Sequence, residues 1–336
     1  MRNNYLRKTN IFQVFLNSCI FSLIMSLAMF GTSNVYSQEE NKGSMETETS
    51  VNTTNLETGK QVVEQVNVLE GGDMIGRIDW ENRVIYSVGD GVMPPDVVSA
   101  AQARVRSKRA AIDEAYGRMV EMANEVRVDA ESTTRNYINE NRVVRTRVSG
   151  MVKNAEVEEI KQFEDGSYQV MMKMSMDGAK GLGSVLLPVQ MERVRNVRVV
   201  SHSKRSAISS AIEPAQESIT KKAENYTGLI IDAMGLGAKP AMYPRVLDEK
   251  GESVYDVASA NPNATIEEGL TGYRKSIDAA KQVARIGNNP LIIKAQKING
   301  KYNADIVVSD SDAQKIFQAD SKGGILGEAK VVVVID

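Results

Sequence analysis

The residues with the clearest chemical potential lie between positions 227 and 244, where the sequence reads TGLIIDAMGLGAKPAMYP. An apolar strand followed by Gly235-x-Gly237 resembles the start of a dinucleotide-binding loop, which also needs a third glycine and a helix facing the phosphates. Here Pro240 occupies the position of the third glycine, and Pro244 follows where that helix should run. Because an interior proline costs a helix about 3 kcal/mol, we predict that Gly235, Gly237 and Pro240 form a structural turn and bind no nucleotide.

Other residue types that support catalysis are scarce. His202 is the only histidine, and the only cysteine, Cys19, lies in an apolar segment near the start of the chain. These counts exclude metal sites built from several histidines or cysteines, and a Ser-His-Asp triad would require His202, which stands in the polar segment SHSKRS. Adjacent carboxylates such as Glu158-Glu159 point apart on a strand or a helix, so they form a poor acid/base pair. We predict no enzymatic activity, no cofactor and no metal.

The first 37 residues have the layout of a signal peptide. Basic residues precede an apolar segment from 11 to 30, and Val35 and Ser37 fit the small-x-small cleavage rule. We predict cleavage before Gln38 and an exported protein, in the periplasm or associated with the outer membrane. Two alternatives are an uncleaved anchor and a lipidated Cys19, and only these would give the chain a membrane contact.

Charge and composition restrict the partners and define a tether. With 41 basic and 43 acidic residues, the net charge is -2, so no overall field attracts nucleic acid, and we predict that none binds. Residues 38–72 are rich in Glu, Thr, Asn and Gly and contain no aromatic residue. We predict a disordered, flexible tether over this segment.

Residues 73–200 carry the pattern of a sheet-and-helix domain. Strand-forming residues flank the turn Glu81-Asn82-Arg83, and a long helix is expected to start at Asp96. The segments 155–163 and 168–176 predict a hairpin, because Asp165-Gly166 supplies the positive backbone angles of a tight turn. Alternating methionines in the second of these strands are expected to lie under the long helix. Apolar spacing predicts the helix face as Val97, Ala101, Val105, Ile112, Ala115 or Tyr116, Met119, Ala123 and Val126.

A polar stretch between the long helix and the hairpin contains Arg142, Arg145 and Arg147. We interpret residues 142–148 as an exposed strand edge, where unpaired backbone groups accept a strand from a partner while the charges limit indiscriminate pairing.

The rest of the chain predicts a helical connection over 201–225 and a second sheet-and-helix domain over 226–336. Its expected elements are a strand from Gly228, a helix over 272–286, two strands flanking Asn299-Gly300, a short helix capped by Ser309, and a central strand in KVVVVID. The predicted fold class is therefore α+β, with two small domains after a signal peptide and a flexible tether.

Several motifs together resemble the bacterial LPP-twenty lipoprotein family over residues 75–177. They are a tryptophan followed after eight residues by Gly89-x-Gly91, the helix segment AAIDEAYGRM, and GMVKNAEVE ahead of EDGSYQV. The segments TGLIIDAMGLGAKPAMYP, NPLIIKA and DIVVSDSDAQKI resemble the extension of longer family members, which include relatives of the flagellar ring protein FlgT. The resemblance implies an envelope protein that acts by assembly and contact.

Two functions follow as hypotheses. The first is a non-enzymatic scaffold or assembly protein of the cell envelope, in a flagellar or other surface complex, that associates with itself or with envelope proteins as a homo-oligomer. The alternative is a periplasmic ligand-binding module with its site in a cleft between the two domains.

Overall fold

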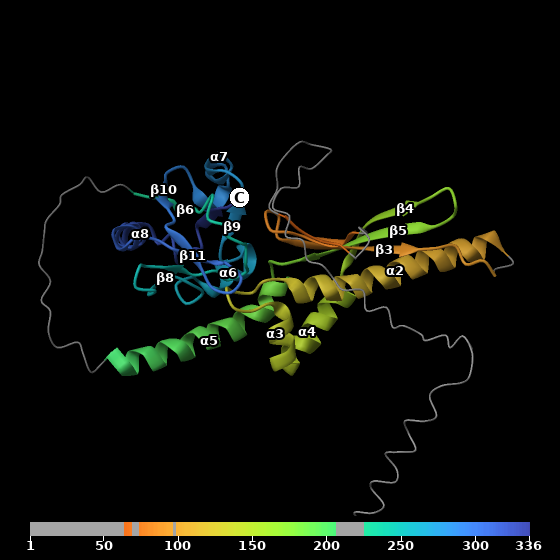
Figure 1. Cartoon of the computed structure of the whole chain (residues 1–336), viewed down its shortest axis with the longest axis horizontal. Helices are drawn as coiled ribbons and strands as arrows, with labels where there is room; N and C mark the ends of the chain where they lie inside the picture. Colours follow the sequence, from red (N-terminus) through yellow and green to blue (C-terminus); the bar gives the residue numbers. More distant parts are fainter. Residues whose placement is uncertain (1–63, 69–73, 97–98, 206–224) are drawn as a thin grey trace, which may run out of the picture. The chain divides into compact units, whose positions relative to one another are not determined.

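The computed structural model describes residues 64–68, 74–96, 99–205 and 225–336. In this part of the chain, helices combine with three separate sheets, so the predicted α+β class is confirmed (Figure 1). The signal peptide, residues 38–63 and 69–72 of the predicted tether, and residues 206–224 of the connection lie outside the described residues. The prediction of a disordered tether is wrong for residues 64–68, which form a strand paired with the next strand of the sheet. None of the described helices is long and apolar enough to cross a bilayer.

An antiparallel five-stranded sheet with the order β1-β2-β3-β5-β4 forms the first part. Its hairpins have the predicted turns, because residues 80–83 join β2 to β3, and β4 and β5 flank Asp165-Gly166. The Asp165 carboxylate accepts a hydrogen bond from the Ser167 amide at 2.9 Å, and Gly166 has a φ of 84°. The strands are β1 (Glu64–Val68), β2 (Met74–Asp79), β3 (Val84–Gly91), β4 (Glu156–Gln162) and β5 (Tyr168–Ser175).

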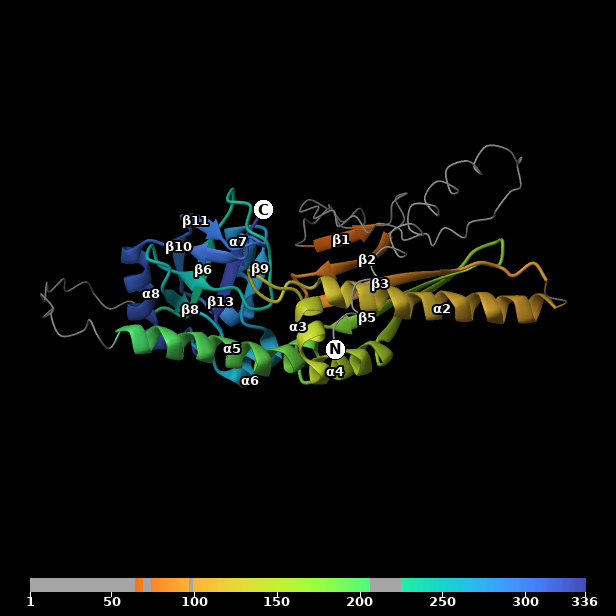
Figure 2. The ribbon, with the colours of Figure 1, turned by 60° about the horizontal axis from the view of Figure 1, so that its bottom comes forward.

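Helix α2 (Ala100–Glu125) packs its backbone directly on β3 and runs along the sheet in Figure 1 and Figure 2. A Cβ at Gly89 would lie 2.2 Å from the carbonyl oxygen of Ala111, so only glycine fits there. The Ser107 hydroxyl donates to the carbonyl oxygen of Gly91, and the Ser87 hydroxyl donates to a helix carbonyl at 2.8 Å. Glycine on the strand therefore lets helix and strand approach closely, and buried serines bind the exposed carbonyls.

The predicted start and face of this helix need correction. Helix α2 begins at Ala100, after Ser99, and not at Asp96. Ala101 and Val105 are exposed, because the buried face of the helix passes through Ala103 and Ser107. Apolar spacing alone could not assign this face, since Ser107 is polar. The buried positions are Ala103, Ser107, Ala111, Ala115, Met119, Met122 and Ala123.

The arginine-rich segment is a helix, so the prediction of an exposed strand edge over 142–148 is wrong. Helix α3 (Thr134–Glu140) leads into α4 (Arg142–Lys153), and the Asn141 side chain caps α4 by accepting from the Val143 amide at 2.9 Å. The buried residues of α4 recur every fourth position, at Val144, Val148 and Val152. This spacing places all three valines on one helix face against the core, which outweighs their preference for strands.

Two further sheets form the C-terminal part. Strand β13 (Val331–Val334) lies between parallel neighbours in the order β10-β6-β13-β9, which confirms its predicted central place. The second sheet has the order β11-β12-β7-β8. The remaining strands are β6 (Gly228–Asp232), β7 (Val246–Leu247), β8 (Ser253–Tyr255), β9 (Gly272–Arg274), β10 (Pro290–Lys294), β11 (Lys297–Asn299) and β12 (Asp305–Val307).

Two expected elements of this part are divided. The segment from 290 to 298 changes sheets at Ala295, whose amide bonds to Asp232 while the next amide bonds to Val307. The predicted helix over 272–286 is partly wrong, because its first residues form β9 beside β13. The predicted Ser309 cap is confirmed, since its hydroxyl accepts from the Asp312 amide at 3.0 Å. The helices are α6 (Pro262–Glu268), α7 (Ile277–Lys281), the 3-10 helix η1 (Ala284–Ile286) and α8 (Asp310–Gly323).

Both parts share one apolar core, which includes Trp80 after β2 and Tyr273 of β9. These rings meet edge to face, with centroids 6.1 Å apart. Residues after α2 also pair with the C-terminal part, because the Met242 and Tyr243 amides donate to the carbonyls of Arg127 and Val128 at 2.9 and 2.8 Å. Helix α5 (Leu182–Arg205) contributes to the same core through Leu182 and its neighbours.

The contact between α2 and β3 predicts opposite outcomes for two glycine substitutions. Gly89→Ala should lower the free energy of unfolding by about 1–3 kcal/mol, because its Cβ must displace helix backbone. Gly117→Ala should raise it by about 0.5–1 kcal/mol, since Gly117 is an exposed α2 residue with no atom within 4 Å of the added Cβ. Urea denaturation measures both, and equal stabilities would contradict this packing.

Candidate functional site

The loop after β6, which begins like a nucleotide fingerprint, contacts a carboxylate of the same chain. Gly235 and Gly237 have φ angles of 77° and 69°, a conformation that favours glycine. The Gly235 amide lies 2.8 and 2.9 Å from the two carboxylate oxygens of Asp336. No helix follows, and the carbonyl of buried Pro240 accepts a hydrogen bond from Arg127 Nε at 2.7 Å. The Gly235 amide, which could otherwise bind an anion, is therefore already bonded to a carboxylate of the same chain.

Arg127 is a buried cation that forms no ion pair with a carboxylate among the described residues. Its guanidinium carbon lies 5.7 Å from the centre of the Trp80 ring, and that of Arg83 lies 5.8 Å from the same centre. Arg83 donates to the Asp177 carboxylate at 2.8 and 3.0 Å. Burial lowers the pKa of Arg127 to about 10, so it stays charged near neutral pH. Cation–π contact with Trp80 stabilises this charge in the core and gives it a structural role.

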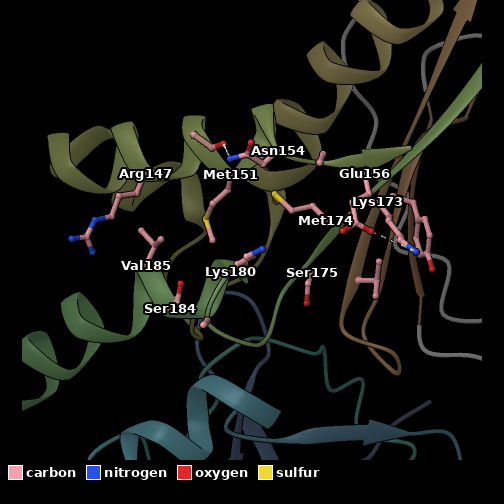
Figure 3. Close-up of a pocket in the computed structure, with 15 residues that line it drawn as sticks. Arg147, Met151, Asn154, Glu156, Lys173, Met174, Ser175, Lys180, Ser184 and Val185 are labelled. Carbon is pink, nitrogen blue, oxygen red and sulfur yellow. Dashed lines mark hydrogen bonds and ion pairs between the residues drawn. The ribbon is translucent and has the colours of Figure 1, made fainter. Parts of the chain in front are cut away.

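A cleft of about 920 Å³ opens between α4, the first turn of α5 and the strands β3 and β5 (Figure 3). It lies beyond the start of β4, where Met174 and Ser175 of β5 pair with β3 on one side and have no β4 residue on the other. Met151, Met174 and Val185 supply its apolar surface, and Ser175 and Ser184 add hydroxyls. This volume is typical of small-molecule sites. The cleft is built within the first sheet-and-helix part, from residues between 84 and 185.

The cations of the cleft differ in their pairing. Lys173 lies 2.6 Å from Glu158 and 4.0 Å from Glu156, and its hydrogen bond to Glu158 raises the lysine pKa. Within the described residues, Arg147 and Lys180 have no ion-pair partner. Figure 3 shows Lys180 among the labelled side chains, whereas the Arg147 guanidinium points away from them. The cleft thus combines an apolar surface with Lys180, which lies among the labelled side chains, and with Arg147, whose guanidinium is directed outward.

The second candidate surface is the open edge of β4. This strand is last in its sheet, and all seven of its residues are exposed, including Val157 and Ile160 at 45% and 40%. Val157 lies opposite Met172 and Ile160 opposite Val170, so both face the side of the sheet that carries the methionines. A bulge between Val157 and Glu159 lets residues three apart share this face. A sequence pattern with a period of two would place Val157 and Ile160 on opposite faces, so it could not predict that they share one.

The arginines proposed as a contact strand lie together on α4 but have different surroundings. All three are exposed. Arg145 donates through Nε to the Ile138 carbonyl at 3.2 Å, and Arg147 lines the cleft. Asp165 and Gly166 lie at the tip of the β4–β5 hairpin, far along the chain from the Gly235 loop. Sequence analysis did not identify Lys180 or Met151, because the α4–α5 contact brings them together from separate segments.

Comparison with known proteins identifies a relative for the C-terminal part alone. Residues 228–336 match the family model of the second domain of Treponema pallidum Tp0624. The matched segment starts at β6 and ends after β13, so it includes both C-terminal sheets. It gives no support to the resemblance to the LPP-twenty family or to FlgT relatives. A search of curated proteins found no match.

The occupied Gly235 loop predicts no nucleotide binding. Isothermal titration with ATP and with NAD should give no saturable heat, because Asp336 already accepts from the Gly235 amide and no helix amino end faces the loop. A micromolar dissociation constant that disappears on Gly237→Val would contradict this assignment.

Proposed function

We propose that this chain is a non-enzymatic scaffold of the bacterial cell envelope that assembles through the open edge of β4. One observation carries the proposal, namely that β4 is an edge strand with every residue exposed, two of them large and apolar. Unpaired amides and carbonyls on such an edge bind another strand through the backbone, and exposed side chains select the partner.

Three further observations support an envelope location and a role in contact. The first 37 residues read as an export signal, and the polar composition of residues 38–63 predicts a tether that would give the domains reach. The match of residues 228–336 is to a domain of a bacterial protein. The motifs over residues 75–177 resemble the LPP-twenty family, and on this resemblance we propose a flagellar or other surface complex as the setting. Its partners are then envelope proteins or further copies of the chain, in the periplasm or at the outer membrane.

Assembly should depend on the β4 edge and not on apolar exposure in general. In the double variant Val157→Lys/Ile160→Lys, the fraction of assembled protein should fall at least about ten-fold, because lysines on an edge strand oppose strand addition. The matched control is Val105→Lys on α2, since Val105 is 69% exposed and lies away from the sheet edge. Light scattering on the secreted chain and cross-linking in intact cells measure the effect.

Thermal unfolding of both variants controls for folding, and neither midpoint should change, because all three side chains are exposed. A wild-type chain that is a strict monomer without any cross-linked partner would overturn the scaffold proposal. Equal assembly of the β4 variant and the Val105→Lys control would overturn the role of β4.

The cleft of Figure 3 favours a second function, a ligand-binding module for small amphiphilic anions. The specific observation is that Arg147 and Lys180, which have no ion-pair partner among the described residues, line a cleft whose apolar surface includes Met151 and Met174. A carboxylate or sulfonate would contact Lys180, with Arg147 adding positive charge nearby, while its apolar portion covers the methionines. This site lies within the first sheet-and-helix part and so replaces the expected cleft between two domains.

The fluorescent dye 1-anilinonaphthalene-8-sulfonate tests this second function, because it is apolar and carries one negative charge. We expect saturable binding that stabilises the protein against heat. The variant Arg147→Glu/Lys180→Glu should weaken binding at least about ten-fold, and Lys108→Glu, on the exposed side of α2, should leave it unchanged. Equal binding by both variants would show that the dye does not use the cleft.

A further inference from the structure

We infer that the partner of β4 is the β4 strand of a second copy, paired antiparallel about a two-fold axis through Ile160. The inference rests on the proposed assembly through β4 and adds the identity of the partner and the register. Two features of the strand favour this register: which backbone groups point outward, and where its charges lie.

The pairing of β4 with β5 determines which backbone amide and carbonyl groups of β4 point to the open edge. The Phe163 amide donates to the Ser167 carbonyl at 3.0 Å, and along the ladder Lys161 lies opposite Gln169 and Glu159 opposite Met171. Backbone groups of successive residues alternate between the two sides of an antiparallel strand. Lys161 and Glu159 therefore bond inward to β5, and the amide and carbonyl groups of Ile160 and Gln162 point to the open edge.

Two open strand edges can pair only if residues whose amide and carbonyl groups point outward lie opposite each other. The two-fold axis must therefore pass through a single residue of β4 and not between two residues. A two-fold axis at Glu159 would place two glutamates directly opposite each other, and an axis at Lys161 would do the same with two lysines. Like charges directly opposite one another destabilise a strand pair. An axis at Ile160 instead places each Glu159 opposite the Lys161 of the other copy, twice in the same interface.

Side-chain positions agree with this register. Glu159 and Lys161 lie on the same face, with Oε2 and Nζ 3.4 Å apart, so the four charges of a pair of strands would form one cluster of alternating sign. On the opposite face Ile160, 40% exposed in the single chain, would cover its own counterpart. The bulge next to Glu159 limits regular pairing to a short segment, and a two-fold contact closes on itself without forming a filament.

Charge exchange tests the register without disturbing buried residues. Glu159→Lys and Lys161→Glu should each raise the dimer dissociation constant at least about ten-fold, because each creates like-charged pairs. The double variant Glu159→Lys/Lys161→Glu restores opposite charges and should return the constant to within about three-fold of the wild type. Sedimentation equilibrium of the full secreted chain measures all four proteins, and failure of the double variant to recover would overturn the register.

A disulfide tests the axis directly. Opposed residues in a hydrogen-bonded antiparallel pair have Cα atoms about 5.5 Å apart, within the range of about 4.4–6.8 Å that a disulfide spans. In a Cys19→Ser background, Ile160→Cys should therefore form a covalent dimer on mild oxidation. The control Val143→Cys places an equally accessible thiol on α4, where Val143 is 59% exposed, and should stay monomeric. Equal cross-linking of both variants, or of neither, would overturn the axis.

The two proposals fail in different ways. A chain that is monomeric in solution but cross-links to other envelope proteins through β4 overturns pairing with a second copy and leaves the scaffold function standing. A chain that is monomeric and has no partner in cells overturns both.

Discussion

Close approach of α2 to β3 at Gly89 and Gly91 constrains most of the described structure. At these positions the strand has no room for a Cβ, and serine hydroxyls bind the carbonyl groups that meet across the contact. Because the helix is held at this depth, its carboxyl end carries Arg127 and the residues after it to residues 240–243 of the C-terminal part. A larger residue on β3 would lift the helix and move this connection with it.

The same connection explains the unusual chemistry of the shared core. Trp80 contacts the guanidinium groups of Arg83 and Arg127 and meets the ring of Tyr273 edge to face. Buried cations are costly unless they are compensated. Asp177 compensates Arg83 through two hydrogen bonds, and the Pro240 carbonyl and the indole ring compensate Arg127. Charged groups in the described core therefore join segments distant in sequence, which is a structural role.

In contrast to this closed interior, the far side of the first sheet is open. Hydrogen bonding in the sheet continues from β3 to β5 and then to β4, whose outer edge has no neighbouring strand in the described structure. A protein that presents a strand edge, and a cleft whose Arg147 and Lys180 have no ion-pair partner among the described residues, is suited to contact. Both proposed functions use surfaces formed by β4, β5 and α4.

By itself the sequence determined the α+β class, the hairpin at Asp165-Gly166, the Ser309 cap and the central place of the final strand, because turn residues, caps and uninterrupted apolar runs act locally. It did not determine the face of α2, since a buried serine interrupts the apolar stripe. Nor did it determine the helical state of residues 142–148, because valines favour strands and only the burial of every fourth residue against the core stabilises a helix there. Nor did it determine the candidate surfaces. The cleft joins α4, β5 and α5, and the exposed face of β4 depends on a bulge, so only tertiary contacts between distant segments and the register of the β4–β5 pair could place these residues together.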